Sequence, residues 1–208
     1  MDGVFMKKCK VWALGFVLFA GILFLIGLVK DQSYLQKNLI RLHIVANSDS
    51  AEDQSVKLFV RDAVTGYLQE QMTDIYNVEE AKTHILSVLP ELEQLVNSAL
   101  RQQGTQDTAR VTLMKEAFDT RHYDTFSLPA GIYESLRITI GEGEGKNWWC
   151  VVFPSLCLPS ATDGFQDTAV SSGFDEGLSN TLSGERGFRV RFYFMDCVGK
   201  MQNLFNFR

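Results

Sequence analysis

The sequence predicts an α+β fold: a mainly antiparallel sheet of four to five strands with two long helices on one face, preceded by an N-terminal membrane helix. Three features predict it. An uncharged apolar stretch lies near the N-terminus, two long stretches carry apolar residues at helical spacing, and several short runs are rich in β-branched and aromatic residues. A chain of 208 residues has room for one such domain besides the membrane segment.

The apolar stretch, Val11 to Val29, contains 19 residues and no charge. As a helix it would be roughly 28 Å long, close to the ~30 Å hydrocarbon layer of a bilayer. Lys7, Lys8 and Lys10 precede it, and such basic flanks stay in the cytoplasm. We therefore expect residues 31–208 to be exported.

This segment is either a retained anchor or a cleaved signal peptide. It is longer than a typical signal-peptide core, and no Ala-x-Ala motif follows Val29, so we favour a retained anchor. The expected organisation is a signal anchor or signal peptide at residues 1–30, a polar spacer at residues 31–38 and an extracytoplasmic domain at residues 39–208.

The first predicted strand covers residues 39–46. Its apolar side chains alternate with Arg41 and His43, which indicates a half-buried strand with those two residues on the opposite face. Residues 47–50, Asn-Ser-Asp-Ser, are typical of turns and of helix N-caps.

Two long helices are predicted, at residues 53–70 and 78–103. In the first, Val56, Phe59 and Val60 begin an apolar stripe that we expect to face the sheet. The second also has a continuous apolar side.

The second helix contains Pro90, which predicts a kink or two separate helices, and Gly104 should end it. Two strands are then expected, at residues 109–117 and 132–141.

The strongest local signal is residues 146–154, Lys-Asn-Trp-Trp-Cys-Val-Val-Phe-Pro, which predict a strand. The glycine-rich residues 141–145 precede it and indicate a hairpin with the strand before them. Trp148 and Trp149 should then point to opposite faces. We expect one to belong to the core and the other to anchor a partner, because tryptophan is enriched at interface hot spots.

Residues 155–187 are rich in Ser, Gly, Asp and Thr without periodicity, and they predict a long, mobile loop. Residues 188–195 alternate apolar and polar side chains and predict a last strand, with a short helix in the tail after it.

The composition argues against nucleic acid as a partner. The chain has 20 basic and 25 acidic residues, and residues 1–30 hold four lysines and one aspartate, so residues 31–208 carry a net charge of −8. A net-acidic body without a basic cluster does not attract a polyanion.

No residue pattern indicates catalysis, a metal or a cofactor, and the protein is expected not to be an enzyme. His43, His84 and His122 lack ligand spacing and accompany no nucleophile signature. Gly141-Glu-Gly-Glu-Gly145 superficially resembles a phosphate loop, but such loops open a helix, whereas a strand follows here and the two glutamates would repel an anion.

Cys150 and Cys157 are either a disulfide or two buried thiols. Cysteines of exported domains tend to oxidise, and Pro154 lets the chain reverse between them, although an extended spacer would keep them apart. Cys197 could compete for either partner, and Cys9 lies on the cytoplasmic side.

Two segments carry a resemblance to a known family. The first is Arg41-Leu-His-Ile-Val-Ala-Asn-Ser-Asp-Ser-Ala-Glu-Asp-Gln54, with Lys57 and Val60-Arg-Asp-Ala-Val64; the second runs from Leu128-Pro-Ala-Gly, through the glycine-rich turn and Asn147-Trp-Trp-Cys150, to Cys157. Together they resemble the stage II sporulation protein R family over roughly residues 39–157. Residues 158–187 and the C-terminal segment depart from the family pattern.

The resemblance implies a signalling protein that is made in the forespore and exported into the space between the forespore and mother-cell membranes. There it would activate the membrane-embedded protease that processes pro-sigma-E. The candidate contact residues are Trp148, Trp149, Asn147, Arg41, His43 and Asn47.

The alternative is an exported hydrolase acting on the cell wall or a peptide. A hydrolase should place His43 or His122 beside a carboxylate in a cleft, whereas a signalling ligand should show a convex apolar patch.

Overall fold

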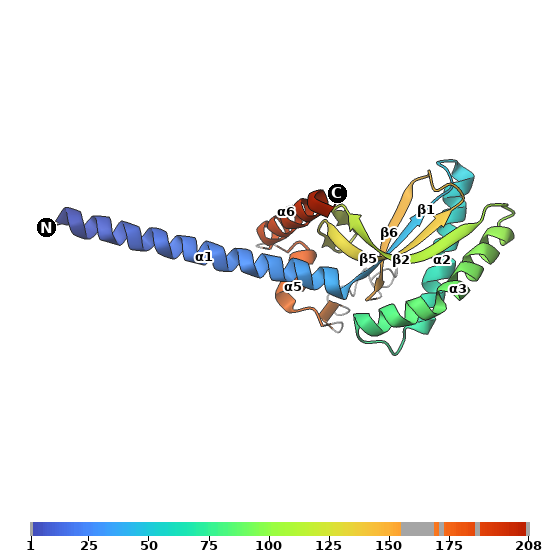
Figure 1. The fold of residues 1–208 in the computed structure, drawn as a ribbon, viewed down its shortest axis with the longest axis horizontal. Helices are drawn as coiled ribbons and strands as arrows, with labels where there is room; N and C mark the ends of the chain where they lie inside the picture. The colour runs from blue at the N-terminus through green and yellow to red at the C-terminus, as the bar shows by residue number, and fades with distance from the viewer. Residues whose placement is uncertain (1, 155–168, 171–172, 186–187, 207–208) are drawn as a thin grey trace.

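In a computed structural model, a long N-terminal helix leads into a four-stranded sheet that has helices on both faces (Figure 1). The structure describes residues 2–154, 169–170, 173–185 and 188–206. The helices are α1 (Asp2–Asn38), α2 (Ala51–Gln71), α3 (Val78–Gln102), α5 (Glu176–Leu182) and α6 (Arg189–Asn206). The strands are β1 (Ile40–Val45), β2 (Ala109–Phe118), β3 (Arg121–His122), β4 (Ser127–Leu128), β5 (Gly131–Ile140) and β6 (Asn147–Phe153).

The sheet has the strand order β2-β5-β1-β6, and β3 and β4 form a separate two-stranded pair. The α+β class and the four strands predicted between residues 39 and 154 are confirmed. Strand β5 is antiparallel to β2, and β6 is antiparallel to β1, but β1 runs parallel to β5. The sheet is therefore mixed, because the chain passes through α2, α3 and β2 before β5 lies down beside β1.

The predicted hairpin of β5 and β6 is wrong, because β1 lies between these two strands. The glycine-rich loop crosses over the end of β1 instead of making a tight reversal. Gly141 and Gly143 do take positive φ angles, of 55° and 67°. The Gly145 N–H donates to the Ala46 carbonyl, which holds the loop against the chain that leaves β1.

Helices α2 and α3 cover one face of the sheet, as predicted, and the first apolar core lies between them and the strands (Figure 1). Ser50 caps α2 by accepting from the Asp53 N–H at 3.1 Å. Helix α3 continues through Pro90 as one element and ends at Gln102, two residues before Gly104, which has a φ of 76°. The alternative of two separate helices is thus excluded.

Phe59 does not belong to this core. Helix α2 buries Val56, Val60, Val64 and Leu68, which follow each other at intervals of four, whereas the Phe59 side chain is 38% exposed. Residues four apart share one narrow face of a helix. Phe59 stands at the border of that face rather than on it.

A second apolar core fills the opposite face of the sheet. It joins Leu28 and Leu35 of α1 to Phe118, Tyr133 and Val151 of the strands, and to residues of α5 and α6. Every residue of β1 is consequently buried. The expectation of a half-buried β1 with one exposed face is wrong, because helices cover both faces and strands flank both edges.

Two segments, residues 31–38 and residues 188–195, differ from their predicted structure. The expected polar spacer at residues 31–38 is the last part of α1, where Gln32 donates to the Ala130 carbonyl at 2.6 Å. Residues 189–195 of the strand expected at residues 188–195 belong to α6. Apolar residues occur on two sides of this helix, and that distribution produced the apparent alternation.

The segment predicted as a long loop contains α5. Asp175 caps this helix by accepting from the Leu178 N–H at 2.8 Å, and Leu178 and Leu182 are buried in the second core. The cap and the two leucines four apart were the sequence signal for it. The remainder of the predicted loop, residues 155–168, 171–172 and 186–187, lies outside the described residues.

Candidate functional site: a polar network across the sheet

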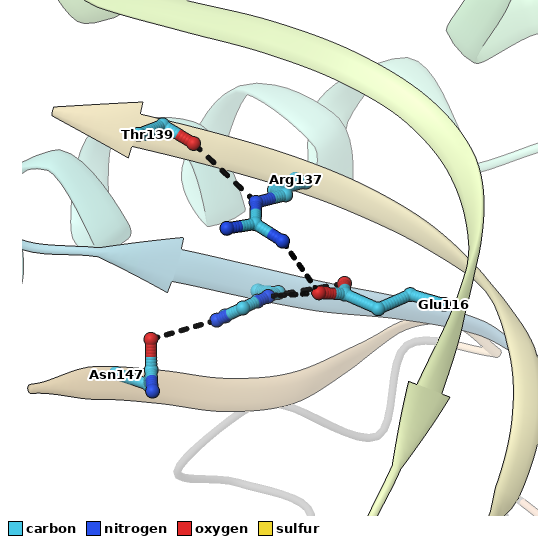
Figure 2. A network of polar contacts seen from close by, with 5 residues as sticks. Glu116, Arg137, Thr139 and Asn147 are labelled. Carbon is cyan, nitrogen blue, oxygen red and sulfur yellow. Dashed lines mark hydrogen bonds and ion pairs between the residues drawn. The ribbon is translucent and has the colours of Figure 1, made fainter. Parts of the chain in front are cut away.

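A polar network crosses all four strands on the sheet face that lies opposite α2 and α3. His43 of β1 stands at its centre, with its Nδ1 at 2.9 and 3.0 Å from the two carboxylate oxygens of Glu116 on β2. Its Nε2 lies 2.8 Å from the Oδ1 of Asn147 on β6. Arg137 of β5 donates to Glu116 at 2.8 Å and to Thr139 at 3.4 Å (Figure 2).

The alternation of side chains along each strand brings these residues together. His43 is paired in register with Arg137 on one side and with Trp149 on the other. Asn147 lies two residues before Trp149, so both side chains project from the same face of β6. The sheet thereby collects charged and amide groups from four separate segments at one place.

The network keeps Glu116 ionised. Burial of the carboxyl would raise its pKa, but the hydrogen bond and charge of His43, a bond from Ser135 and the charge of Arg137 together lower the pKa below its ordinary value. Glu116 is thus a carboxylate bonded to two cationic or donor groups in a largely enclosed position. Such a pair contributes stability only while both partners are present.

The His43–Glu116 pair places a histidine beside a carboxylate, which is half of the criterion stated above for a hydrolase. However, Nε2, the nitrogen that would take a proton from a nucleophile, is already bonded to Asn147. His122 is bonded to the Ser127 hydroxyl at 2.8 Å, not to a carboxylate. Among the described residues, no group of three or more His, Cys, Asp or Glu side chains is arranged to hold a metal ion. The arrangement is suited to orienting Asn147 and joining strands.

Trp149 extends this site at the edge strand. Its ring stacks on His43 with the centroids 3.6 Å apart and meets Phe118 edge-on at 4.9 Å. The guanidinium carbon of Arg121 lies 4.8 Å from the Trp149 ring. Trp149 is therefore held between aromatic, imidazole and guanidinium groups, and part of it remains exposed.

Trp148 points to the other face, as predicted, and packs against the first core. Arg61 of α2 lies over its ring at 4.6 Å. Both tryptophans are partly buried. The expectation that only one of them belongs to the core is wrong, because each face of the sheet has a core of its own and each tryptophan packs against one.

Arg41 and His43 do not form an exposed edge. Arg41 is fully buried, donates to the Tyr123 hydroxyl at 3.0 Å and lies 4.0 Å from the Phe118 ring. His43 is only 4% exposed. Neither side chain can touch a partner without a change in the fold, so both support the site from within.

Asn47 connects the glycine-rich loop to helix α2. Its Oδ1 accepts from the Glu142 N–H at 3.0 Å, and its Nδ2 donates to Asp53 at 3.2 Å. Lys57 is buried and donates to the Lys146 carbonyl at 2.8 Å, and this burial lowers the pKa of its ammonium group. Both residues shape the loop that leads into β6, which for Asn47 is in keeping with its predicted turn role.

Sequence reasoning missed Glu116, Arg137 and Arg121. The alternation of β2 and β5 could have placed the first two on one face, but only the register of the sheet sets them beside His43. Arg121 belongs to the two-residue strand β3, which has no recognisable pattern.

Cys150 takes part in a disulfide, and Cys197 is a free thiol. The expected partner, Cys157, lies outside the described residues, so this pairing stays a prediction.

Comparison with known proteins places these features in a family. A family model described as stage II sporulation protein R matches residues 36–163. The chain is 37% identical over 158 residues to the stage II sporulation protein R of Bacillus subtilis (strain 168), an alignment that covers 72% of this chain and 70% of that protein. No solved structure matches the chain.

Proposed function

Because the chain belongs to the stage II sporulation protein R family, we propose that it is an exported sporulation signal that activates the membrane-embedded protease processing pro-sigma-E in the mother cell. It would act in the space between the forespore and mother-cell membranes. Membership of the family supports the sporulation role. Features of the structure support the position of the domain at a membrane and the choice of contact surface.

The observation that carries this proposal is the way α1 joins the domain. Its apolar part is long enough to cross a membrane, and its last turns are part of the second core, where Leu28 and Leu35 are buried. The domain and the membrane helix are thus one continuous structure. A retained α1 would keep the domain at a membrane surface, which is where a membrane-embedded protease can be reached.

For the contact surface we propose the exposed side of the polar network. Asn147 is exposed at the edge strand, and Trp149, Arg121 and Arg137 are each partly exposed around it. Tryptophan and arginine are the residues most enriched at interface hot spots. The buried members of the network would hold these groups in a fixed orientation, which lowers the entropy lost on binding.

The test compares two arginines that each cover one tryptophan. The chain is produced with the protease and its pro-sigma-E substrate in a host that exports it, and cleavage is measured by immunoblot. Arg121→Ala should lower activation by roughly 30-fold, which corresponds to a hot-spot loss of ~2 kcal/mol. Arg61→Ala, the matched control on the other face, should leave activation near the wild-type level.

Thermal melting of both variants checks that neither has unfolded, and Arg121→Lys keeps the charge while removing the planar stacking group. Full activation by Arg121→Ala, or an equal loss in Arg61→Ala, would show that the contact surface lies elsewhere. A chain that leaves pro-sigma-E uncleaved in every form would contradict the proposed function itself.

A further inference from the structure

The outward side of α6 is an apolar surface without charge. Its exposed large residues, here called the α6 stripe, are Val190, Tyr193, Phe194, Met201, Leu204 and Phe205. At about 100° per residue they fall within an arc of about 120° on the helix. The opposite side packs on the domain, where Met195 is buried and Asn203 donates to the Phe118 carbonyl at 2.9 Å.

The α6 stripe is continuous with the surface of α1. The Phe194 ring meets the Phe24 ring edge-on with the centroids 6.0 Å apart. Further along, Arg191 forms an ion pair with Asp31, and Gln36 donates to Gln202 at 2.5 Å. Figure 1 shows α6 lying beside the part of α1 that enters the domain.

These contacts set α6 at the level of a bilayer boundary. Phe24 lies within the apolar stretch, five residues before Val29, which is ~7.5 Å along a helix. If that stretch fills the hydrocarbon layer, the first turns of α6 must enter the boundary region of the same bilayer. Gln36, which bonds to Gln202 near the end of α6, lies ~10 Å beyond Val29 along the helix. The end of α6 is therefore at the level of the lipid headgroups, and a tilt of α1 brings it closer to the hydrocarbon layer.

We propose that the α6 stripe is a membrane-binding surface, which seats the exported domain on the lipid bilayer that α1 crosses. Tyrosine and phenylalanine suit the boundary between hydrocarbon and headgroups. Arg189 and Lys200 flank the stripe on the side of the headgroups, and Lys200 is also ion-paired at 2.8 Å with Asp196, the one acidic residue of α6, which is buried. Contact of the α6 stripe with the bilayer fixes the orientation of the domain. With a single spanning helix as its one membrane contact, the domain could rotate about the axis of that helix.

Photo-crosslinking of the full chain in vesicles of phosphatidylcholine and phosphatidylglycerol tests this surface. A p-benzoylphenylalanine replaces Tyr193 or Phe205 on the stripe, or Tyr76 as the control. Tyr76 is also an aromatic residue and is 79% exposed, as against 80% for Phe205, but it lies between α2 and α3. Mass spectrometry then measures the fraction of each variant that carries a lipid adduct.

We expect lipid adducts at position 193, fewer at position 205 and a background level at position 76. Val190→Glu should reduce the adduct at position 193, whereas Leu86→Glu, on the exposed side of α3, should leave it unchanged. Adducts at position 193 that are no more frequent than at position 76, or adducts to a second copy of the chain in place of lipid, would overturn the proposal. Because no protease is present, this outcome is independent of the proposed function.

Discussion

Replacing Glu116 by glutamine removes the carboxylate on which the polar network converges. His43 and Arg137 both bond to it, and the Glu116 side chain is 13% exposed. Leaving a buried charge without its partner costs about 3–5 kcal/mol. Arg137 is one-third exposed, so water compensates part of that loss, and we expect Glu116→Gln to lower the free energy of unfolding by about 2–3 kcal/mol at pH 7.

The effect should depend on pH in a defined direction. The pKa of Glu116 is lowered in the folded chain, so between that value and the ordinary value the unfolded chain binds more protons than the folded one. The stability that Glu116 contributes is present above the ordinary glutamate pKa of about 4.3 and is lost as the pH falls through the folded value. The difference between wild type and Glu116→Gln should therefore be full at pH 7 and shrink below about pH 4.

Urea unfolding of the full chain in detergent measures this difference. Unfolding is followed by circular dichroism at pH 7 and again below about pH 4. Glu134→Gln is the matched control, because Glu134 is similarly enclosed, at 15% exposure, but among the described residues its ion pair is with Lys82 alone, at 2.6 Å. We expect the control to lose about 1 kcal/mol or less. A Glu116→Gln loss no larger than the control, or a difference that does not shrink in acid, would refute the reasoning.

Three further outcomes are expected. Val60→Ala should lower the free energy of unfolding by about 2–3 kcal/mol, since it removes two buried carbons and leaves a cavity. Phe59→Ala should lower it by less than about 1 kcal/mol, because the Phe59 side chain is partly exposed. Urea unfolding that reverses this order would contradict the burial of α2. Gly145→Ala should cost about 1–3 kcal/mol because its Cβ would collide with the Ser48 carbonyl, and thermal melting of an unaffected variant would show that the loop can shift. A reporter enzyme fused after residue 31 should be active only outside the cytoplasm, and activity of a strictly cytoplasmic reporter there would reverse the proposed orientation.

The sequence alone determined the elements whose signals are local. The spacing of apolar residues located α2 and α3, and the alternation of short runs located β1, β2, β5 and β6, because both periods follow from backbone geometry. The cap at Ser50 and the glycine just after α3, Gly104, were equally local signals. The uncharged stretch after the N-terminal lysines identified α1 for the same reason.

Only the tertiary structure decided which segments lie side by side. Strand β1 inserted between β5 and β6, and this long-range pairing replaced the hairpin that the glycine-rich turn predicted. The same pairing buried Arg41 and His43 and set His43 beside Glu116, 73 residues away in the sequence.

Helix α6 shows most clearly what the sequence alone could not predict. Residues 188–195 alternate as a strand would, yet from Arg189 onward they are helical, with one apolar side on the second core and another exposed. Whether this segment forms a strand or a helix depends on whether α1, α5 and the sheet offer a surface that buries its apolar side. That surface exists only once distant parts of the chain have assembled, because propensity over a few residues is weaker than the burial of a packed face.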